Sequence, residues 1–302
     1  MVYRDLLRAG GAELGVPEEE VARFSDRLLR YQIRAGDRPK GAGADDEPKG
    51  VPVGRRGGLP ELPAGMPWPS LAEPSYPAGA PLPFMLSLDC AALPRVPGLP
   101  LPADGSLLFF LDPQGAQECG TMSIEREQTC ARVVYVPAGT PTEVAQQPPV
   151  DEYAAETFLS AERDLHASVQ ADLYVSPDDI TSDFERHLIH DLPHFAALCA
   201  LAQRLHPSRP GDGNAVLIGG YTISAQDSPE LLMADELATG EPGPDPFLDP
   251  QEAEHEVVRE WVPLAQFAAP HHEFLFARFL IRHDDLAAGR FGAALSFCEF
   301  TE

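Results

Sequence analysis

Proline is the residue that most limits what this chain can fold into. Thirteen of its 32 prolines lie between residues 52 and 102. Because proline lacks a backbone N–H and fixes φ, neither a helix nor a long central strand can run through such a segment. The composition favours short strands joined by turns. Since 44% of the 302 residues are hydrophobic, the chain also has the apolar residues that a globular core requires.

Short apolar runs bounded by turn residues predict the strands of a β-rich protein. Three such runs lie between residues 83 and 136, and four more follow residue 214. The expected strands span residues 83–89, 106–112, 131–136, 215–218, 261–264, 274–281 and 294–300, with one helical turn at 283–286 between the last two.

Other segments have the pattern of helices. Residues 17–35 begin with a proline and three glutamates, which suit the first turn of a helix. Apolar side chains then recur at spacings of three and four, so we expect one amphipathic helix there. A flexible linker is expected over residues 41–50. Residues 151–206 are expected to be helical, with one helix that begins at Ser176-Pro177 and another over 191–205. The predicted fold class is therefore α+β.

The charge of the chain excludes several kinds of partner. It has 22 basic and 47 acidic residues, a net charge of −25. Residues 1–60 hold 11 basic and 10 acidic residues, so the excess of acid lies beyond residue 60. Phosphate recognition needs clustered Lys and Arg, and we therefore expect neither a nucleic acid nor an anionic membrane as partner.

The compartment is predicted from what the sequence lacks. No apolar run approaches the roughly 20 residues of a membrane-spanning helix, and the first eight residues are too charged for a secretory signal. The five cysteines, at positions 90, 119, 130, 199 and 298, are odd in number and widely spaced, which favours reduced thiols. We therefore expect a cytoplasmic protein.

His187, His190 and His194 are the candidate metal ligands. Their spacing places them near one helical face, where three imidazoles could hold zinc. With Asp183 or Asp191 beside them in a pocket, they would make a metal-dependent hydrolase. The sequence favours surface histidines instead, because Pro193 interrupts the helix.

No other motif indicates catalysis. None of the cysteines or serines lies in a recognised nucleophile motif, and the glycine-rich turns lack the lysine of a nucleotide-binding loop. The sequence therefore predicts no catalytic residue and no cofactor.

Acidic residues are dense in a proline-containing loop that we expect over residues 235–256. We expect this loop to contact a basic protein partner, because charge complementarity raises association rate and selectivity. The alternative is that the acidity only keeps the protein soluble. The candidate contact residues are Asp235, Glu236, Glu241, Asp245, Asp249, Glu252 and Glu254.

A series of motifs runs in order along the chain. It begins with Gly57-Gly58-Leu59-Pro60 and Met66-Pro67-Trp68-Pro69 and continues with blocks at 84–89, 101–110 and 284–291. The series resembles the YwqG-like family, a bacterial domain of unknown function, over most of residues 51–302. The resemblance implies a mixed α+β fold without an established activity, and an immunity or binding role because members sometimes occur near bacterial toxin genes. The motif residues are Gly57, Gly58, Pro60, Trp68, Pro69, Asp89, Gly105, Phe109, Phe110, Gly219, Asp285, Leu286 and Phe291.

A repeated order of motifs predicts two diverged halves. Gly57-Gly58 precedes a strand and then a Phe-rich strand, and Gly219-Gly220 precedes a similar series. The alternative is coincidence, because the spacing from the glycines to the next strand differs between the two series. The predicted organisation is a helical arm and linker over 1–50 and one domain over 51–302, in which β-rich halves at 51–150 and 211–302 flank a helical segment at 151–210.

Overall fold

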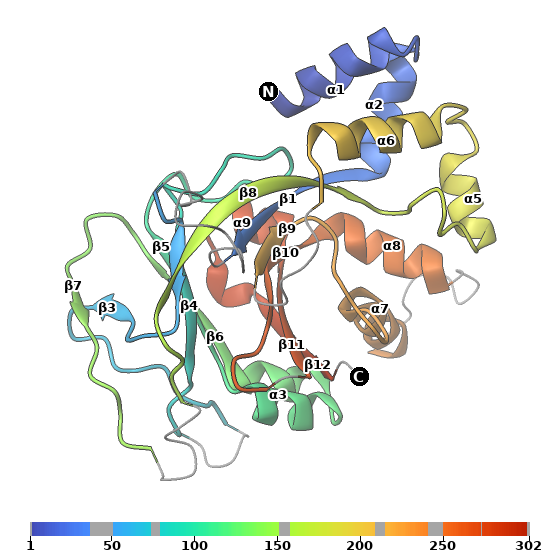
Figure 1. The fold of residues 1–302 in the computed structure, drawn as a ribbon. Coiled ribbons are helices and arrows are strands. Elements are labelled where there is room, and N and C mark those ends of the chain that lie inside the picture. The colour runs from blue at the N-terminus through green and yellow to red at the C-terminus, as the bar shows by residue number, and fades with distance from the viewer. Residues whose placement is uncertain are drawn as a thin grey trace.

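The computed structural model describes residues 2–36, 51–73, 79–150, 158–208, 215–240, 250–272 and 274–300. The predicted α+β class is confirmed: one large antiparallel sheet has helices packed along part of its periphery (Figure 1). None of the helices in these ranges is long and apolar enough to cross a membrane. The helices are α1 (Val2–Glu13), α2 (Glu18–Arg27), α3 (Pro113–Gly120), α4 (Ile124–Glu127), η1 (Gln128–Cys130), α5 (Asp183–Ile189), α6 (Phe195–Leu205), α7 (Pro229–Gly240), α8 (Pro250–Glu260), α9 (His283–Ala287) and η2 (Phe291–Ala293).

Ten strands of the described chain form the sheet, in the spatial order β12-β11-β10-β9-β1-β8-β2-β4-β5-β6, and β3 and β7 form a separate pair. All seven predicted strands are confirmed, as is the helical turn between the last two. The bounds are β1 (Leu29–Gly36), β2 (Gly54–Arg56), β3 (Glu61–Pro63), β4 (Phe84–Asp89), β5 (Ser106–Leu111), β6 (Ala131–Val136), β7 (Thr142–Val144), β8 (Arg163–Leu173), β9 (Val216–Gly219), β10 (Trp261–Ala268), β11 (Leu275–Arg282) and β12 (Leu295–Phe300).

The prediction of a single helix over residues 17–35 is wrong in its second half. Helix α2 ends at Arg27, and the next residues form β1, which pairs with β8 from Leu29↔Leu173 to Gly36↔His166. Side chains in β1 are buried on both faces, so pairing inside the sheet outweighs the helical spacing. Residues 29–36 therefore form a central strand of the sheet and are not part of a separate helical arm. The expected linker, residues 41–50, lies outside the described residues.

The prediction of a helical segment over 151–210 is also wrong in part, because the segment contains β8, eleven residues long. Strand β8 pairs with β1 on one side and β2 on the other. Helices α5 and α6 follow it, and α6 confirms the helix expected up to residue 205.

The expected helix start at Ser176 is wrong, because α5 begins after Ser182. The Ser182 hydroxyl oxygen accepts a hydrogen bond from the Glu185 N–H at 3.1 Å, and the Glu185 carboxylate accepts one from the Ser182 N–H at 2.9 Å. These two bonds satisfy backbone donors that a helix N-terminus otherwise leaves unpaired. Ser176 offers a serine and a following proline but lacks the glutamate three positions later.

The acidic segment predicted as a loop over 235–256 is helical wherever the structure describes it. Helix α7 enters the segment from one side and α8 begins at Pro250, while residues 241–249 lie outside the described residues. Pro250 indicated a loop in the sequence, but it occupies the first helical position, where proline's missing N–H costs nothing. The two helices pack on the outer strands through a small apolar cluster of Met233, Ala234, Val257, Leu280 and Phe297.

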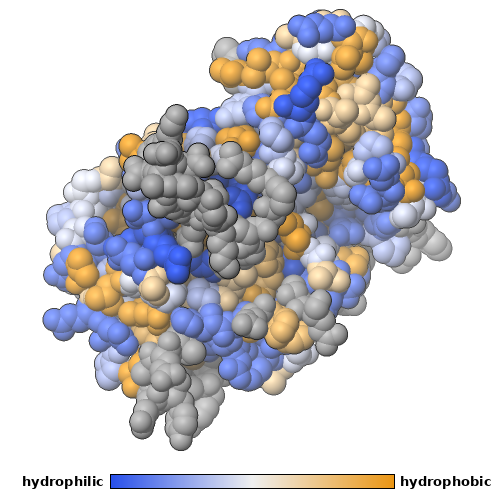
Figure 2. Space-filling model, in the orientation of Figure 1, coloured by the Kyte–Doolittle hydropathy of each residue, from blue (hydrophilic) through white to orange (hydrophobic). Residues whose placement is uncertain are grey.

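The sheet curls so that its two ends approach each other around one hydrophobic core. Phe109 of β5 lies 5.1 Å from Phe279 of β11 between ring centroids. Tyr135 of β6 lies 5.1 Å from Phe291, which just precedes β12. Helices α1, α2 and α6 form a lobe at one end (Figure 1), over which hydrophobic residues gather on the face drawn in Figure 2.

The strands have an approximate two-fold arrangement about the central β1–β8 pair. Strands β2, β4, β5 and β6 lie on one side and β9, β10, β11 and β12 on the other, each set in sequence order with helices before its last strand. Strand β1 precedes β2 but pairs with β9, and β8 precedes β9 but pairs with β2. This topology supports the predicted duplication, with the first strands exchanged; the duplication itself stays a prediction.

Candidate functional site

The acidic residues of the chain are concentrated at helices α7 and α8. Residues 226–260 hold eleven acidic residues and one basic residue. Glu252, Glu256 and Glu260 are exposed and follow each other at intervals of four along α8, so they form an acidic row on one side of the helix. Like charges at this spacing destabilise a helix. The stability of α8 therefore does not explain the row.

The carboxylates of the acidic row remain accessible to a partner. Glu256 pairs with Arg259 at 3.2 Å and Glu260 with Arg282 at 3.0 Å, but these four side chains are 48–66% exposed. Ion pairs this exposed contribute little stability and are readily exchanged.

The structure separates the predicted contact residues into three groups. Asp235 and Glu252 are exposed, whereas Glu254 is half-buried and accepts a hydrogen bond from the Ser228 hydroxyl, which holds α8 against the start of α7. The side chain of Glu236 and residues Glu241, Asp245 and Asp249 lie outside what the structure describes. Sequence reasoning missed Glu256 and Glu260, although their four-residue spacing after Glu252 is a signal that could have found them.

The end of α8 is fixed by Arg30 of β1. Its guanidinium donates to the carbonyl oxygens of Val258 and Gly220 (the latter at 3.1 Å) and stacks over the Tyr221 ring at 4.6 Å. A cation at the C-terminal end of a helix also complements the helix dipole. Arg30 lines a polar pocket of about 260 Å³ together with Arg4, Arg259, His283 and other residues. No local sequence pattern could indicate this contact, because Arg30 and Val258 are 228 positions apart.

The start of α7 is fixed by a buried ion pair. Arg278 of β11 pairs with Glu299 of β12, and the two side chains are only 1% and 8% exposed. Arg278 also donates to the Ile223 carbonyl oxygen at 2.6 Å, and Glu299 accepts from the N–H groups of Ala225 and Gln226 at 2.7 Å each. A buried pair persists only when such hydrogen bonds satisfy the remaining polar atoms. The segment that leads into α7 is therefore rigidly held.

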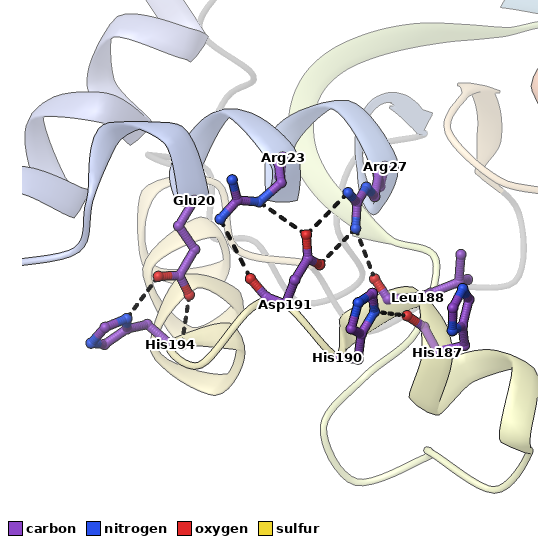
Figure 3. Close-up of polar contacts among 8 residues, drawn as sticks. All are labelled: Glu20, Arg23, Arg27, His187, Leu188, His190, Asp191 and His194. Carbon is purple, nitrogen blue, oxygen red and sulfur yellow. Dashed lines mark hydrogen bonds and ion pairs between the residues drawn. The ribbon is translucent and has the colours of Figure 1, made fainter.

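The histidines weighed as metal ligands do not converge (Figure 3). His187 and His190 are exposed at the end of α5, with stacked rings 4.9 Å apart. His194 precedes α6, and its Nδ1 lies 2.9 Å from Oε2 of the buried Glu20. No three His, Cys, Asp or Glu side chains in the described ranges are placed to hold a metal ion.

Asp191 ties the α5–α6 connection to α2 (Figure 3). Arg27 donates to both of its carboxylate oxygens, at 2.7 and 3.2 Å, and Arg23 Nε lies 3.2 Å from Oδ2. Hydrogen bonds from Arg27 hold the pKa of Asp191 below its usual value. Asp183 is exposed at the start of α5 and pairs with Arg186 at 2.8 Å. Neither aspartate faces a histidine across a pocket, and the polar contacts in this region join helices.

Residues 54–298 match the family model described as "Domain of unknown function (DUF1963)". The chain belongs to this family. The match begins at the first residue of β2 and ends within β12, so β1 precedes the matched region although it lies at the centre of the sheet. A search of curated proteins finds no match to the chain.

The motif glycines of this DUF1963 domain lie where strands pack closely. Gly57 has φ 67°, and a Cβ there would lie 2.5 Å from the Ser160 carbonyl oxygen. Gly58 follows it with φ 69° and lies against the Glu162 side chain. Gly105 and Gly219 also have positive φ, of 81° and 70°. Glycine is favoured at these positions because the backbone has a positive φ there. A glycine has no side chain that could take part in a reaction.

The other motif residues of the DUF1963 domain pack the core or close turns. The Trp68 indole N–H donates to the Leu82 carbonyl oxygen at 2.8 Å, and its ring contacts Phe110. Phe109, Phe110, Leu286 and Phe291 are buried. The carbonyl oxygens of Pro60 and Pro69 accept backbone hydrogen bonds, and Asp89 and Asp285 accept from the Ala91 N–H and Arg290 side chain. The contacts described for these motif residues are therefore those of core packing and of turns.

Proposed function

We propose that this protein binds a basic protein partner through the helix pair α7–α8. The acidic row, Glu252, Glu256 and Glu260, carries the proposal, because it presents like charges on one side of a helix at a spacing that does not stabilise the helix. The local excess of ten acidic residues over residues 226–260 adds a field that attracts and orients a cationic surface.

The rigidity of the helix pair also supports recognition. Arg30 at the end of α8 and the Arg278–Glu299 pair before α7 hold both helices without using the exposed carboxylates. A surface that is ordered before binding loses less conformational entropy when a partner docks. An immunity protein that neutralises a basic toxin, as the resemblance to the bacterial YwqG-like family implies, would be one protein of this kind.

The alternative of a metal-dependent hydrolase gains no support from the histidine segment. Asp191 is engaged by two arginines and His194 by Glu20, and the remaining two histidines stack on each other at the surface. Acidic residues that served solubility alone would not need to be aligned along one helix. Neutralising three acidic residues in the row, or three elsewhere on the surface, therefore distinguishes partner binding from solubility.

The test compares two variants that change the net charge equally. The row variant carries Glu252→Gln, Glu256→Gln and Glu260→Gln, and the control carries Glu13→Gln, Glu19→Gln and Asp179→Asn at exposed sites elsewhere. Each protein is immobilised and used to capture basic proteins from a lysate in 0.1 M salt. We expect a basic protein to be retained by the wild type and the control, about tenfold less by the row variant, and released at 1 M salt.

Two outcomes contradict the proposal. Equal capture by the row variant shows that the row is not the contact surface. Equal loss from both variants shows that overall charge, and not the helix pair, governs association.

A further inference from the structure

Two of the five cysteines touch where the segment α3–η1 packs against β12. Cys119 lies near the end of α3 and Cys130 at the end of η1, and their sulfur atoms are 3.8 Å apart. Cys298 of β12 lies in the same region, where Oε1 of the neighbouring Glu127 carboxyl group accepts its N–H. The eleven-residue separation of Cys119 and Cys130 matches no redox motif, so the sequence alone did not indicate the contact.

We propose that Cys119 and Cys130 are a redox-active dithiol that a hydroperoxide oxidises to a disulfide. Cys119 is half-buried, whereas Cys130 is 1% exposed and its sulfur lies 3.8 Å from that of Cys119. Redox-sensing sites pair an accessible cysteine with a second cysteine that resolves the oxidised form. Cys90 and Cys199 have no such partner described and are buried, and burial raises the pKa of each thiol to about 12.

The reaction has two steps. The thiolate sulfur of Cys119 attacks a peroxide oxygen, the O–O bond breaks, and an alcohol or water leaves with the thiol proton, which gives a sulfenic acid at Cys119. The sulfur of Cys130 then attacks Sγ of Cys119, the S–O bond breaks, and the hydroxyl leaves as water with the Cys130 proton. The two thiols lose two electrons in total, and the hydroperoxide gains them.

Closure requires only a local movement. A disulfide has an S–S distance of about 2.05 Å, so the sulfur atoms must approach by less than 2 Å from their present 3.8 Å. Both residues lie at the ends of short helical segments, where side-chain rotation and small shifts are accommodated more easily than within a sheet. The bond would join the end of α3 to the start of β6 and enclose α4.

The experiment uses the full-length protein treated with hydrogen peroxide and then alkylated under denaturing conditions. Trypsin cleaves after Arg126, so Cys119 falls on peptide 96–126 and Cys130 on peptide 127–132. We expect these two peptides to be linked, the number of free thiols to fall from five to three, and dithiothreitol to reverse both changes. We also expect the melting temperature of the oxidised protein to rise, because the link restricts the unfolded chain.

Two variants control for the identity of the pair. In Cys119→Ser all four remaining thiols should survive the same treatment, whereas in the matched variant Cys199→Ser their number should fall from four to two. Sulfinic acid at Cys119 without a link, a link that involves Cys298, or five unchanged thiols would each overturn the proposal. The peptide map of the wild type decides the question even where a variant folds poorly.

Discussion

At the scale of single residues, a buried carboxyl group makes stability depend on pH. Glu127 is 4% exposed, and burial raises its pKa to about 8 although the Cys298 N–H and the charge of Arg278 oppose the shift. The folded protein therefore holds this proton up to about pH 8, whereas the unfolded chain releases it near pH 4.5. Because the unfolded state binds fewer protons in this window, the contribution of Glu127 to stability falls as pH rises.

We expect Glu127→Gln to become more stable relative to the wild type as pH rises. The amide oxygen still accepts the Cys298 N–H, but the variant has no proton to lose. At pH 5 the two proteins should differ little, and at pH 8 the variant should be more stable by about 2 kcal/mol or more, since one unit of pKa shift corresponds to about 1.4 kcal/mol. Urea unfolding at pH 5, 6.5 and 8 with reductant measures this, with Glu118→Gln on the exposed side of α3 as control. A stability difference that is the same at all three pH values contradicts the assignment.

The charged residues that hold the candidate site were not predictable one by one. Arginine is usually found at the protein surface. Arg30 and Arg278 nevertheless donate hydrogen bonds to main-chain oxygens that are far away in sequence. Only the folded backbone brings those oxygens together. The exposed glutamates are different, because a row of charges on a helix is a local sequence pattern. Glu252 was identified from the sequence. Glu256 and Glu260 were missed, although they follow it at the same four-residue spacing.

At the scale of elements, a helix or strand could be predicted when a short stretch of sequence carried its pattern, and was missed when only its pairing partners define it. Strands with apolar runs between turns, such as β5 and β11, were identified because the run itself requires burial on both faces. Strand β8 was missed because His166, Ser168 and Gln170 give its half-buried pattern no apolar run. Strand β1 was read as helix because Tyr31 continues the spacing of α2, and only its pairing with β8 and β9 reveals a strand.

The start of α5 gives a test at this scale. Ser182 forms both hydrogen bonds of a capping box with Glu185, whereas Ser176 precedes no helix. We expect Ser182→Ala to cost about 1 kcal/mol of stability and to speed amide hydrogen exchange in α5, because a backbone donor loses its partner. Ser176→Ala should have little effect on either quantity. Equal effects of the two substitutions would show that the cap does not stabilise the helix.

At the scale of the whole molecule, the exchange of β1 and β8 binds the two ends of the chain into one folding unit. Both partners of β1, β8 and β9, come from beyond residue 150, and both partners of β8, β1 and β2, come from before it. The predicted halves at 51–150 and 211–302 therefore each lack strands at the centre of the sheet. The order of the motifs predicts an approximate two-fold arrangement. It does not predict which strands cross between the halves, because strand pairing is decided only in the assembled sheet.

A cut between residues 150 and 151 tests this organisation. Fragments 1–150 and 151–302 each leave a central strand without its partners, and we expect neither to show a cooperative urea transition alone. Mixed, they should form a 1:1 complex with one cooperative transition, because β1 can again pair with β8 and β9.

The matched control mixes fragment 51–150 with 151–302. Without β1, the space between β8 and β9 is empty, and we expect no complex. Cooperative unfolding of 51–150 alone, or full recovery without residues 1–50, would show instead that the halves are independent and that β1 only lies against a sheet that is already complete.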